Sequence, residues 1–166
     1  MTVQRLTFRR YHDADHDAAW SVFAAGTAQL GFQNGPWDDD MRHIPAVYLE
    51  PGGEFIVGDD GGRIVAIAAY RREADGRASV HRVAVHPDAQ GRGVGRTIMA
   101  DLEARARQAD IAVLHLDTSI GQIAAQRLYA ACGYEQVGRI VQSGVECILY
   151  EKRIAMDNEG QTDGIF

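Results

Sequence analysis

Val80-His-Arg-Val-Ala-Val-His-Pro-Asp-Ala-Gln-Gly-Arg-Gly-Val-Gly-Arg96 is the stretch that decides the fold of this chain. In its first half the β-branched residues Val83 and Val85 alternate with residues of other types, which predicts a strand. Pro87 has no N–H to donate to a neighbouring strand, so this strand is expected to end near His86.

The second half of the stretch is a glycine-rich loop that runs into a helix. Glycines let the backbone approach a ligand and turn successive N–H groups toward it. The helix is predicted by apolar residues that recur at the spacing of one helical face, Val94, Ile98 and Leu102. A helix N-terminus adds unpaired donors and a positive dipole end, so this arrangement favours a phosphate ligand. Arg92 and Arg96 add positive charge beside the loop.

Two common phosphate-binding motifs fit this loop poorly. A Walker loop needs a lysine after its last glycine, and a dinucleotide fingerprint needs a third glycine where this chain has Arg96. The pattern that fits is Gln-x-x-Gly-x-Gly, beginning at Gln90. With the Val-Ala-Val-His-Pro strand before it, the loop resembles the acyl-coenzyme A pyrophosphate loop of the GNAT superfamily of N-acetyltransferases. An ordinary glycine-rich turn is the alternative interpretation.

A second motif carries the same resemblance between residues 122 and 134. Many GNAT enzymes have Asn, then Ala three residues later, Leu six later, Tyr seven later, and Gly-Phe or Gly-Tyr shortly after. This chain matches that pattern at Ala125, Leu128, Tyr129, Gly133 and Tyr134. It departs from the pattern at Gln122, which replaces the asparagine and puts that residue's contact with the pantetheine arm in doubt.

The resemblance implies an α/β acyltransferase fold, with a mixed, mostly antiparallel sheet of about seven strands, a central parallel pair and helices on both faces. Outside the two motifs, the residue patterns predict strands over 3–10, 54–58, 63–71, 111–117, 134–142 and 145–153. Helices are expected after Asp13 or Asp15, where Trp20, Phe23 and Ala24 would form the buried stripe, and over 41–50, bent or broken at Pro45. The near-continuous apolar run of strand 111–117 is typical of a strand covered on both faces. We expect one domain over residues 1–154 and a polar tail over 155–166.

The resemblance also assigns a cofactor site for acetyl-CoA. The strands that end at Val85 and Asp117 would separate at their C-terminal ends and admit the cofactor. Backbone groups of Val83 and Val85 would then be free to bind the pantetheine arm and the thioester carbonyl. The expected cofactor-binding residues are Val83, Ala84, Val85, Gln90, Gly91, Arg92, Gly93, Val94, Gly95, Arg96, Asp117, Ser119, Gln122, Ala125, Leu128 and Tyr129. For Asp117 and Ser119, capping of the next helix is the alternative.

Two residues are candidates for the chemistry. The resemblance places the hydroxyl of Tyr129 near the thioester sulfur, where a phenol can donate a proton at neutral pH; packing on its helix is the alternative. His81 lies two residues before Val83 on the central strand and would share its face. A histidine occupies the corresponding position in arylalkylamine N-acetyltransferases, and Glu54 or water are rival bases. His115 is expected to be a packing residue.

Composition limits the other classes of function. The formal net charge is −6 and arginine is spread along the chain, which disfavours a nucleic-acid surface. No apolar run approaches the ~18 residues of a membrane span, and no leader precedes the first strand. Cys132 and Cys147 lack metal-ligand spacing and are expected to be buried free thiols in a reducing cytoplasm. No metal is expected.

The sequence therefore predicts acetyl-CoA-dependent N-acetylation of a small amine or a peptide amine, by direct transfer in a ternary complex. The rival functions are a non-catalytic acyl-CoA sensor or partner subunit, and a nucleotide-dependent kinase, which the absent Walker lysine disfavours. Asp38 to Asp40, with Trp37 and Phe32, would line the acceptor pocket or form a solvated helix start. A homodimer is an option that the resemblance leaves open.

Overall fold

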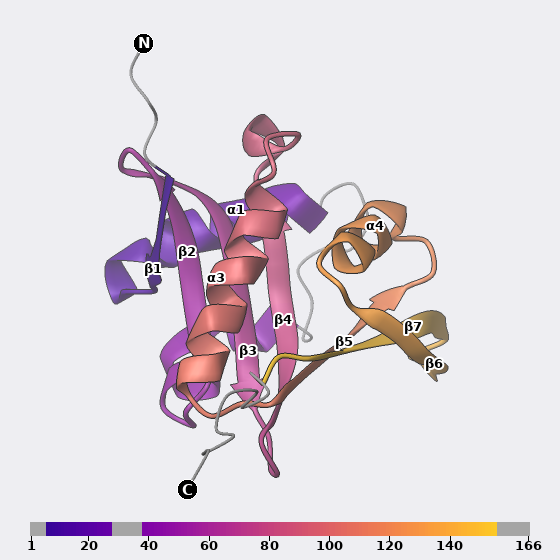
Figure 1. Ribbon diagram of the computed structural model, residues 1–166. Coiled ribbons are helices and arrows are strands. Elements are labelled where there is room, and N and C mark those ends of the chain that lie inside the picture. The colour runs from indigo at the N-terminus through magenta and orange to yellow at the C-terminus, as the bar shows by residue number, and fades with distance from the viewer. Residues whose placement is uncertain (1–5, 28–37, 156–166) are drawn as a thin grey trace, which may run out of the picture.

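The computed structural model describes residues 6–27 and 38–155, and these form one seven-stranded sheet with helices on both faces (Figure 1). The strand order is β1-β2-β3-β4-β5-β7-β6, in which β4 and β5 run parallel and the other neighbours antiparallel. The strands are β1 Leu6–Arg10, β2 Glu54–Asp60, β3 Arg63–Arg72, β4 Arg77–Val85, β5 Val113–Ser119, β6 Glu135–Gln142 and β7 Val145–Arg153. The predicted fold class is confirmed, including its central parallel pair.

The helices are α1 His16–Thr27, α2 Asp39–Arg42, α3 Val94–Gln108 and α4 Ile123–Ala131. Short 3₁₀ turns at Asp13–Asp15 and Pro87–Ala89, and a π-helix at Pro45–Leu49, complete the described elements. The break predicted at Pro45 is confirmed, because α2 ends at Arg42 and a separate helical turn begins at the proline.

Each face of the sheet has its own hydrophobic core, and α3 lies in front of the sheet in Figure 1 while α1 lies behind it. The α3-side core includes Ile98, Leu102 and Tyr129, and the α1-side core includes Phe23 and Tyr48. The buried stripe predicted for α1 is partly wrong. Its buried residues are Ala19, Val22 and Phe23, whereas Trp20 is half-buried with Arg42 over its ring.

The parallel pair β4–β5 is short, and this shapes the middle of the sheet. Cα partners extend only from Arg77 to Ser79 on β4 and from Val113 to His115 on β5, after which the two strands diverge (Figure 1). The predicted separation of these strands is confirmed. Double-sided coverage of β5 is wrong, because Leu114, Leu116 and Thr118 are buried while Asp117 between them is exposed.

A β-bulge interrupts β4 immediately after its paired segment. Ala69 faces His81 and Ile67 faces Ala84, so two residues of β4 oppose one of β3. Arg82 takes the extra place with a φ of 54°, in the left-handed region. The expectation that His81 shares a face with Val83 is therefore wrong. His81 lies 6.2 Å from the ring of Tyr48 on the α1 side, and Val83 packs on the α3-side core.

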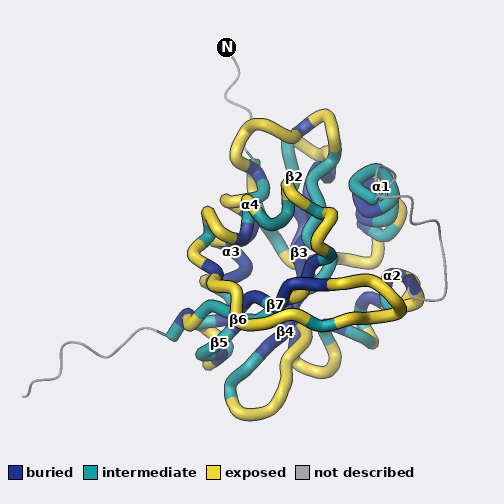
Figure 2. The backbone as a smooth tube through the Cα atoms, turned by 90° about the vertical axis from the view of Figure 1, so that its right-hand side faces the viewer, coloured by how far each residue is buried: buried dark blue, intermediate teal, exposed yellow. Residues whose placement is uncertain are grey.

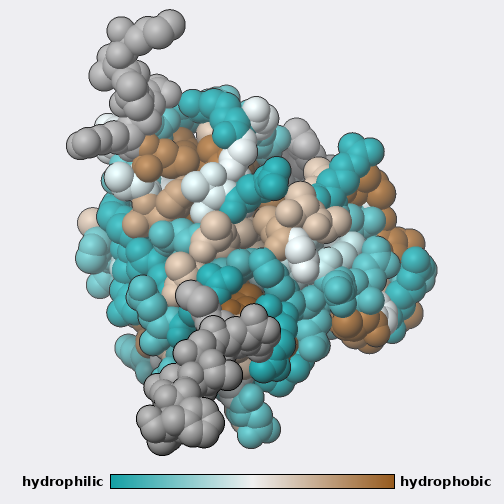
Figure 3. All heavy atoms as spheres, viewed as in Figure 1, coloured by the Kyte–Doolittle hydropathy of each residue, from teal (hydrophilic) through white to brown (hydrophobic). Residues whose placement is uncertain are grey.

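The β6–β7 hairpin forms the far edge of the sheet and is exposed along most of β6 (Figure 2). Val137, Val141 and Val145 are exposed there, and Figure 3 shows a brown, hydrophobic area at this side of the molecule. A homodimer stays a prediction.

The structure also bears on the expectations about the cysteines, membrane spans, metal sites and the domain boundary. Cys132 is half-buried, Cys147 is buried, and both are free thiols. No helix in residues 6–27 and 38–155 is long and apolar enough to cross a membrane. The same residues contain no group of three or more His, Cys, Asp or Glu side chains placed to hold a metal. The single-domain boundary at residue 154 stays a prediction, since residues 156–166 lie outside the described part.

Candidate active site

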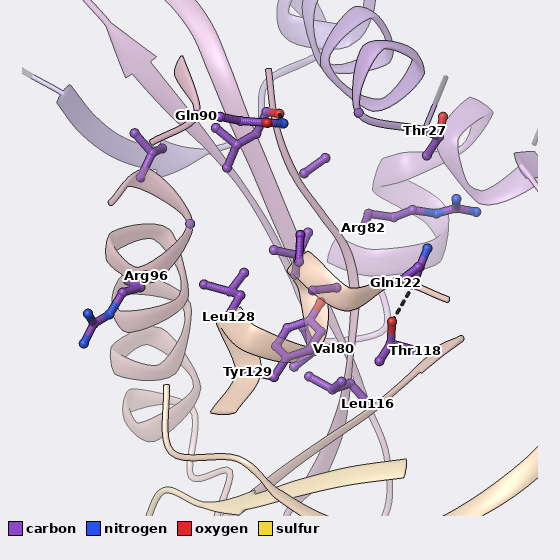
Figure 4. A pocket seen from close by; sticks show the side chains of 18 of the residues that line it. Thr27, Val80, Arg82, Gln90, Arg96, Leu116, Thr118, Gln122, Leu128 and Tyr129 are labelled. Carbon is purple, nitrogen blue, oxygen red and sulfur yellow. Dashed lines mark hydrogen bonds between the residues drawn. The ribbon is translucent and has the colours of Figure 1, made fainter. Parts of the chain in front are cut away.

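A cavity of about 920 Å³ opens where β4 and β5 diverge, between α3 and α4 (Figure 4). Both predicted catalytic residues line it, and so do all the predicted cofactor-binding residues except Arg92 and Ser119. The structure thus brings together two motifs that are about thirty residues apart in sequence.

The β4 wall of the cavity presents backbone groups that no neighbouring strand pairs. The N–H of His86 bonds to the carbonyl of Val65 on β3 at 2.8 Å. Because backbone groups alternate between the two edges of a strand, those of Val85 and Val83 point away from β3. Since β5 no longer pairs with β4 at this level, these groups face the cavity.

The glycine-rich loop forms the end of the cavity next to α3. Gly91 and Gly93 have φ values of 78° and 75°, and a Cβ built on either would meet no atom within 4 Å. Positive φ explains why glycine suits both positions, and the open space beside them leaves room for a ligand. Val94 begins α3, so the unpaired N–H groups of its first turn add donors. This end of the cavity fits a diphosphate.

Gly95 has a different role from the two loop glycines. A Cβ at Gly95 would lie 3.3 Å from both terminal methyl carbons of Leu128 and 3.8 Å from a methyl of Val85. Glycine therefore lets α3 approach α4 and the end of β4 closely.

Neither of the two arginines expected beside the phosphates extends its guanidinium group into the cavity. Arg96 lines the cavity, but its guanidinium points away from Tyr129 and Gln122 in Figure 4. Arg92 lies outside the lining residues and donates to the carbonyl of Asp88 at 3.3 Å. In this structure, the backbone supplies the donors at the phosphate end.

Two glutamines hold the cavity's walls in place. The side chain of Gln90 donates to the carbonyl of Val85 at 3.0 Å and ties the loop to the end of β4. Gln122, in the place of the family's asparagine, accepts a hydrogen bond from Thr118 across the mouth of the cavity (Figure 4). Ser119 acts through its carbonyl, which accepts from the N–H of Gln122 as in a helix cap. Thr118 is a site residue that the motif did not indicate.

Tyr129 lies on the inner side of α4 and is 8% exposed. Its ring centroid lies 5.9 Å from those of Tyr134 and Tyr150, and no partner bonds its hydroxyl among the described residues. Burial raises the pKa of Tyr129, with smaller contributions from Cys132 and Asp117. The phenol is therefore protonated throughout the neutral range, and Figure 4 shows it inside the cavity.

His81 lines the same cavity from the β4 side. Its Nε2 lies 2.8 Å from Oγ of Ser79. Burial lowers the pKa of His81, and Arg71 lowers it further. The imidazole is therefore neutral near pH 7 and able to accept a proton.

The position of Glu54 excludes it as the catalytic base. It is 4% exposed, it is not among the residues that line the cavity, and its carboxylate is held by Arg10 at 2.9 and 3.0 Å. Glu54 also pairs with Arg105 of α3 at 3.7 Å, and a carboxylate held by two arginines outside the cavity cannot reach the acceptor.

Arg82 is the main site residue that the sequence reasoning missed. From the bulge, its guanidinium grips the carboxylate of Asp40 through Nε at 2.8 Å and also through Nη2, and contacts Asp38 at 3.5 Å. The ring of Phe23 lies 4.7 Å below it. The hydroxyl of Tyr48 donates to the same carboxylate of Asp40.

This cluster decides the role of the acidic run. Asp38 and Asp40 are neither a solvated helix start nor open acceptor ligands, because they anchor α2 to β4 through Arg82. An arginine in the middle of a buried strand, with an acidic run elsewhere in the chain, was the signal that could have indicated the pair. Trp37 and Phe32 lie outside the described residues.

Comparisons with known proteins agree with this geometry. The model of the acetyltransferase (GNAT) family matches residues 14–134. Phosphinothricin N-acetyltransferase of Alcaligenes faecalis is 32% identical over 146 residues, which are 83% of this chain and 74% of that protein. N-alpha-acetyltransferase RimI of Mycobacterium tuberculosis is 31% identical over 120 residues, 67% of this chain and 69% of that protein. A Salmonella typhimurium acetyltransferase solved with its cofactor acetyl-CoA superposes with a TM-score of 0.75, at 21% identity, over 92% of this chain and 96% of its own.

The fold and the cavity define the class of protein as an acyl-CoA-dependent transferase. The chain belongs to the GNAT family of acetyltransferases, and it is an N-acetyltransferase that uses acetyl-CoA.

Proposed function

We propose that this enzyme transfers the acetyl group directly to the amine of a small molecule or a peptide, both reactants being held in one cavity. The observation that carries this proposal is the convergence of free β4 backbone groups, the glycine-rich loop and the Tyr129 hydroxyl on that cavity. Holding two reactants together in this way supplies several kcal/mol of the barrier reduction.

Different parts of the cavity suit different parts of acetyl-CoA. The loop N–H groups around Gly91 and Gly93 and the first turn of α3 suit the diphosphate. The backbone groups of Val83 and the N–H of Val85 suit the amides of the pantetheine arm. When bound, acetyl-CoA supplies a thioester carbonyl carbon that an amine can attack.

The side chains around that position suit the proton transfers. His81 accepts a proton from the acceptor's ammonium group, so that a neutral amine forms the new C–N bond. The N–H of Val83 stabilises the carbonyl oxygen as it gains negative charge. As the C–S bond breaks, Tyr129 donates its proton to the sulfur, the nitrogen of the adduct loses its second proton, and that proton returns to the phenolate through water.

The names of the two relatives point to different acceptors. One is named for phosphinothricin, a small molecule, and the other for an α-amino group. Both names support an amine acceptor for this enzyme, and they leave a small molecule and a peptide as the two choices to be tested.

The test is release of free thiol from acetyl-CoA in the presence of a panel of small amines and peptides. We expect steady release with at least one acceptor class, together with the acetylated amine by mass spectrometry. Calorimetric binding of acetyl-CoA without turnover on any amine would favour the non-catalytic sensor. Binding of ATP in place of acetyl-CoA would favour the kinase.

Tyr129→Phe tests the acid. Because only the hydroxyl is removed, we expect kcat to fall by about a hundredfold, within the usual range for general acid–base catalysis. Affinity for coenzyme A should change little in calorimetry. Tyr134→Phe is the matched control, since its ring lies beside that of Tyr129 but does not line the cavity. Equal kcat values for wild type and Tyr129→Phe would leave Tyr129 a packing residue.

A further inference from the structure

A second cavity, of about 480 Å³, lies at the opposite end of α3 from the candidate active site. The last turn of α3 lines it, whereas the first turn of α3 lines the acetyl-CoA cavity. The helix between them is about 20 Å long, and Figure 1 shows its two ends at opposite ends of the sheet. No described residue lines both cavities, so the second cavity is a separate place on the molecule.

A buried carboxylate holds two arginines at the wall of this second cavity. Glu54, whose side chain is 5% exposed, accepts hydrogen bonds from Arg10 at 2.9 and 3.0 Å. The same carboxylate lies 3.7 Å from Nη1 of Arg105. All three residues line the cavity. Glu54 therefore fixes two guanidinium groups from distant segments, β1 and α3, next to one space.

Each of these guanidinium groups keeps a nitrogen that no described residue uses as a hydrogen-bond donor. Arg10 bonds to Glu54 through Nε and Nη2. Arg105 bonds to Asp101 through Nε and to the carbonyl of Phe8 through Nη2. The Nη1 atoms of both arginines are left to donate to a ligand.

Tyr70 adds a hydroxyl to the same cavity. It lies opposite Glu54 in the β2–β3 ladder and is 2% exposed. Its hydroxyl bonds to no described residue, and the hydroxyl oxygen is not fully enclosed, so it faces the cavity that Tyr70 lines. Burial raises the pKa of Tyr70, and Glu54 raises it further, so the hydroxyl keeps its proton at neutral pH. A buried donor without a protein partner indicates a place that an acceptor atom can occupy.

The charges around the cavity favour an anion. Arg72 lies at its edge and donates to the carbonyls of Gly52 and Ala109, which line it. The carbonyl at the negative end of the α3 dipole is thus already bonded to a cation. With Arg72, three arginines stand against two carboxylates, Glu54 and Asp101, and one positive charge remains.

We propose that the second cavity binds a small molecule through an oxyanion, a carboxylate or a phosphate, held between Arg10, Arg105 and Tyr70. Its oxygens accept from the two Nη1 atoms and from the hydroxyl, a geometry that guanidinium groups and oxyanions share. The volume is within the usual range for small-molecule sites. The site does not depend on the proposed acetyl transfer, because none of its residues lines the acetyl-CoA cavity.

The test is an NMR titration of the whole protein with inorganic phosphate and, separately, with acetate. Coenzyme A is present at saturation so that the glycine-rich loop is occupied. We expect saturable shifts, in the millimolar range, of the Nε–H signals of Arg10 and Arg105 and of the amides of 52–54. Sodium chloride at the same ionic strength should give no saturable shift. The probe with the lower Kd identifies the oxyanion that the site prefers.

Tyr70→Phe removes only the hydroxyl, which has no partner among the described residues, so the fold should be kept. We expect Kd for the preferred probe to rise by about tenfold, because a hydrogen bond to a charged group is lost. Tyr11→Phe is the matched control, since Tyr11 is 4% exposed and lies outside the cavity. Its Kd should equal that of wild type.

Arg105→Gln tests the charge. This change leaves Arg10 paired with Glu54, so the buried carboxylate keeps its main partner. We expect the saturable shifts of the Arg10 Nε–H signal to be lost. Arg139→Gln, on the exposed β6–β7 hairpin, is the control for loss of one positive charge and should bind as wild type does.

The outcomes separate this site from the enzyme's function. Shifts confined to Gly91 and Gly93, or no saturable shift at all, overturn the anion site while leaving acetyl transfer to its own assay. Equal Kd values in wild type, Tyr70→Phe and Arg105→Gln overturn it as well. Saturable shifts that both variants weaken and both controls keep support it, even for a protein that acetylates no amine.

Discussion

At the scale of single residues, His81 suits the role of general base because its imidazole is buried, is neutral near pH 7 and lines the cavity. Burial lowers the pKa of His81 below its usual value of 6.5. The rate of the wild-type enzyme should therefore fall only as pH drops below about 6.5, where the imidazole begins to be protonated.

His81→Ala should remove this acidic limb and lower kcat by about a hundredfold at neutral pH. The measurement is kcat/KM across pH 5 to 9 for both proteins. His86→Ala is the control, since His86 caps the turn at Pro87–Ala89 and is not among the lining residues. An acidic limb that survives in His81→Ala would give the base to another group or to water.

Asp40 matters for stability, because it is the carboxylate that Arg82 grips. Burial raises the pKa of Asp40, but hydrogen bonds from Arg82 and Tyr48 outweigh it and hold the pKa below the usual value of 3.8. Its stabilising effect is thus fully present above about pH 4 and is lost as pH falls through the folded-state pKa.

Asp40→Asn should lower the free energy of unfolding by about 2 kcal/mol at pH 7, the typical worth of a hydrogen-bonded charge. The difference from wild type should start to shrink below about pH 4 and should vanish only once the pH is below the lowered folded-state pKa of Asp40. Urea unfolding at pH 7 and pH 3 measures both effects. Asp39→Asn makes the same change at an exposed neighbour and should cost under about 0.5 kcal/mol. Equal stability of Asp40→Asn and Asp39→Asn would show that the Arg82 contacts contribute nothing.

At the scale of elements, the contact between α3 and α4 sets one dimension of the cavity. Alanine at Gly95 gains about 1 kcal/mol of helix propensity. Its Cβ, however, would press on the methyls of Leu128 at 3.3 Å. We expect Gly95→Ala to push the helices apart and raise the Kd for acetyl-CoA several-fold, with little loss of stability. Calorimetry and thermal unfolding separate the two effects.

Gly138→Ala is the matched control for this change. Gly138 lies on β6, and a Cβ there would make an ordinary contact with Leu149 at 3.6 Å. It should leave acetyl-CoA binding unchanged. A Kd for Gly95→Ala equal to that of wild type would show that Leu128 yields without moving α4.

At the scale of the whole molecule, the divergence of β4 and β5 leaves backbone groups unpaired inside a seven-stranded sheet. In the free protein we expect fast hydrogen exchange at the N–H groups of Val83 and Val85. The N–H of His86 on the same strand is bonded to Val65 and should exchange slowly.

Coenzyme A should slow exchange at Val83 and Val85 by at least about tenfold, which corresponds to about 1.4 kcal/mol. His86 serves as the internal control and should change little. Slow exchange at Val83 and Val85 without ligand would mean that these groups have partners, and the proposed binding edge would be wrong.

The sequence by itself determined the strand, loop and helix around Gly91 and Gly93, and the helix that carries Tyr129. These depend on local rules, namely β-branched alternation, positive φ at glycine and apolar residues one turn apart. The same rules placed the hairpins and the helix break at Pro45. The family resemblance then supplied the mixed sheet with its central parallel pair and the opening between β4 and β5.

Only the tertiary structure decided which residues meet. The bulge at Arg82 turned His81 away from the face of Val83, because one extra residue reverses the alternation of a strand. Ion pairs between distant segments assigned Glu54 to Arg10, Asp40 to Arg82 and Glu73 to His115. Such pairs depend on strand order and register, which bring residues about forty positions apart in sequence into contact. Local sequence patterns therefore cannot predict them.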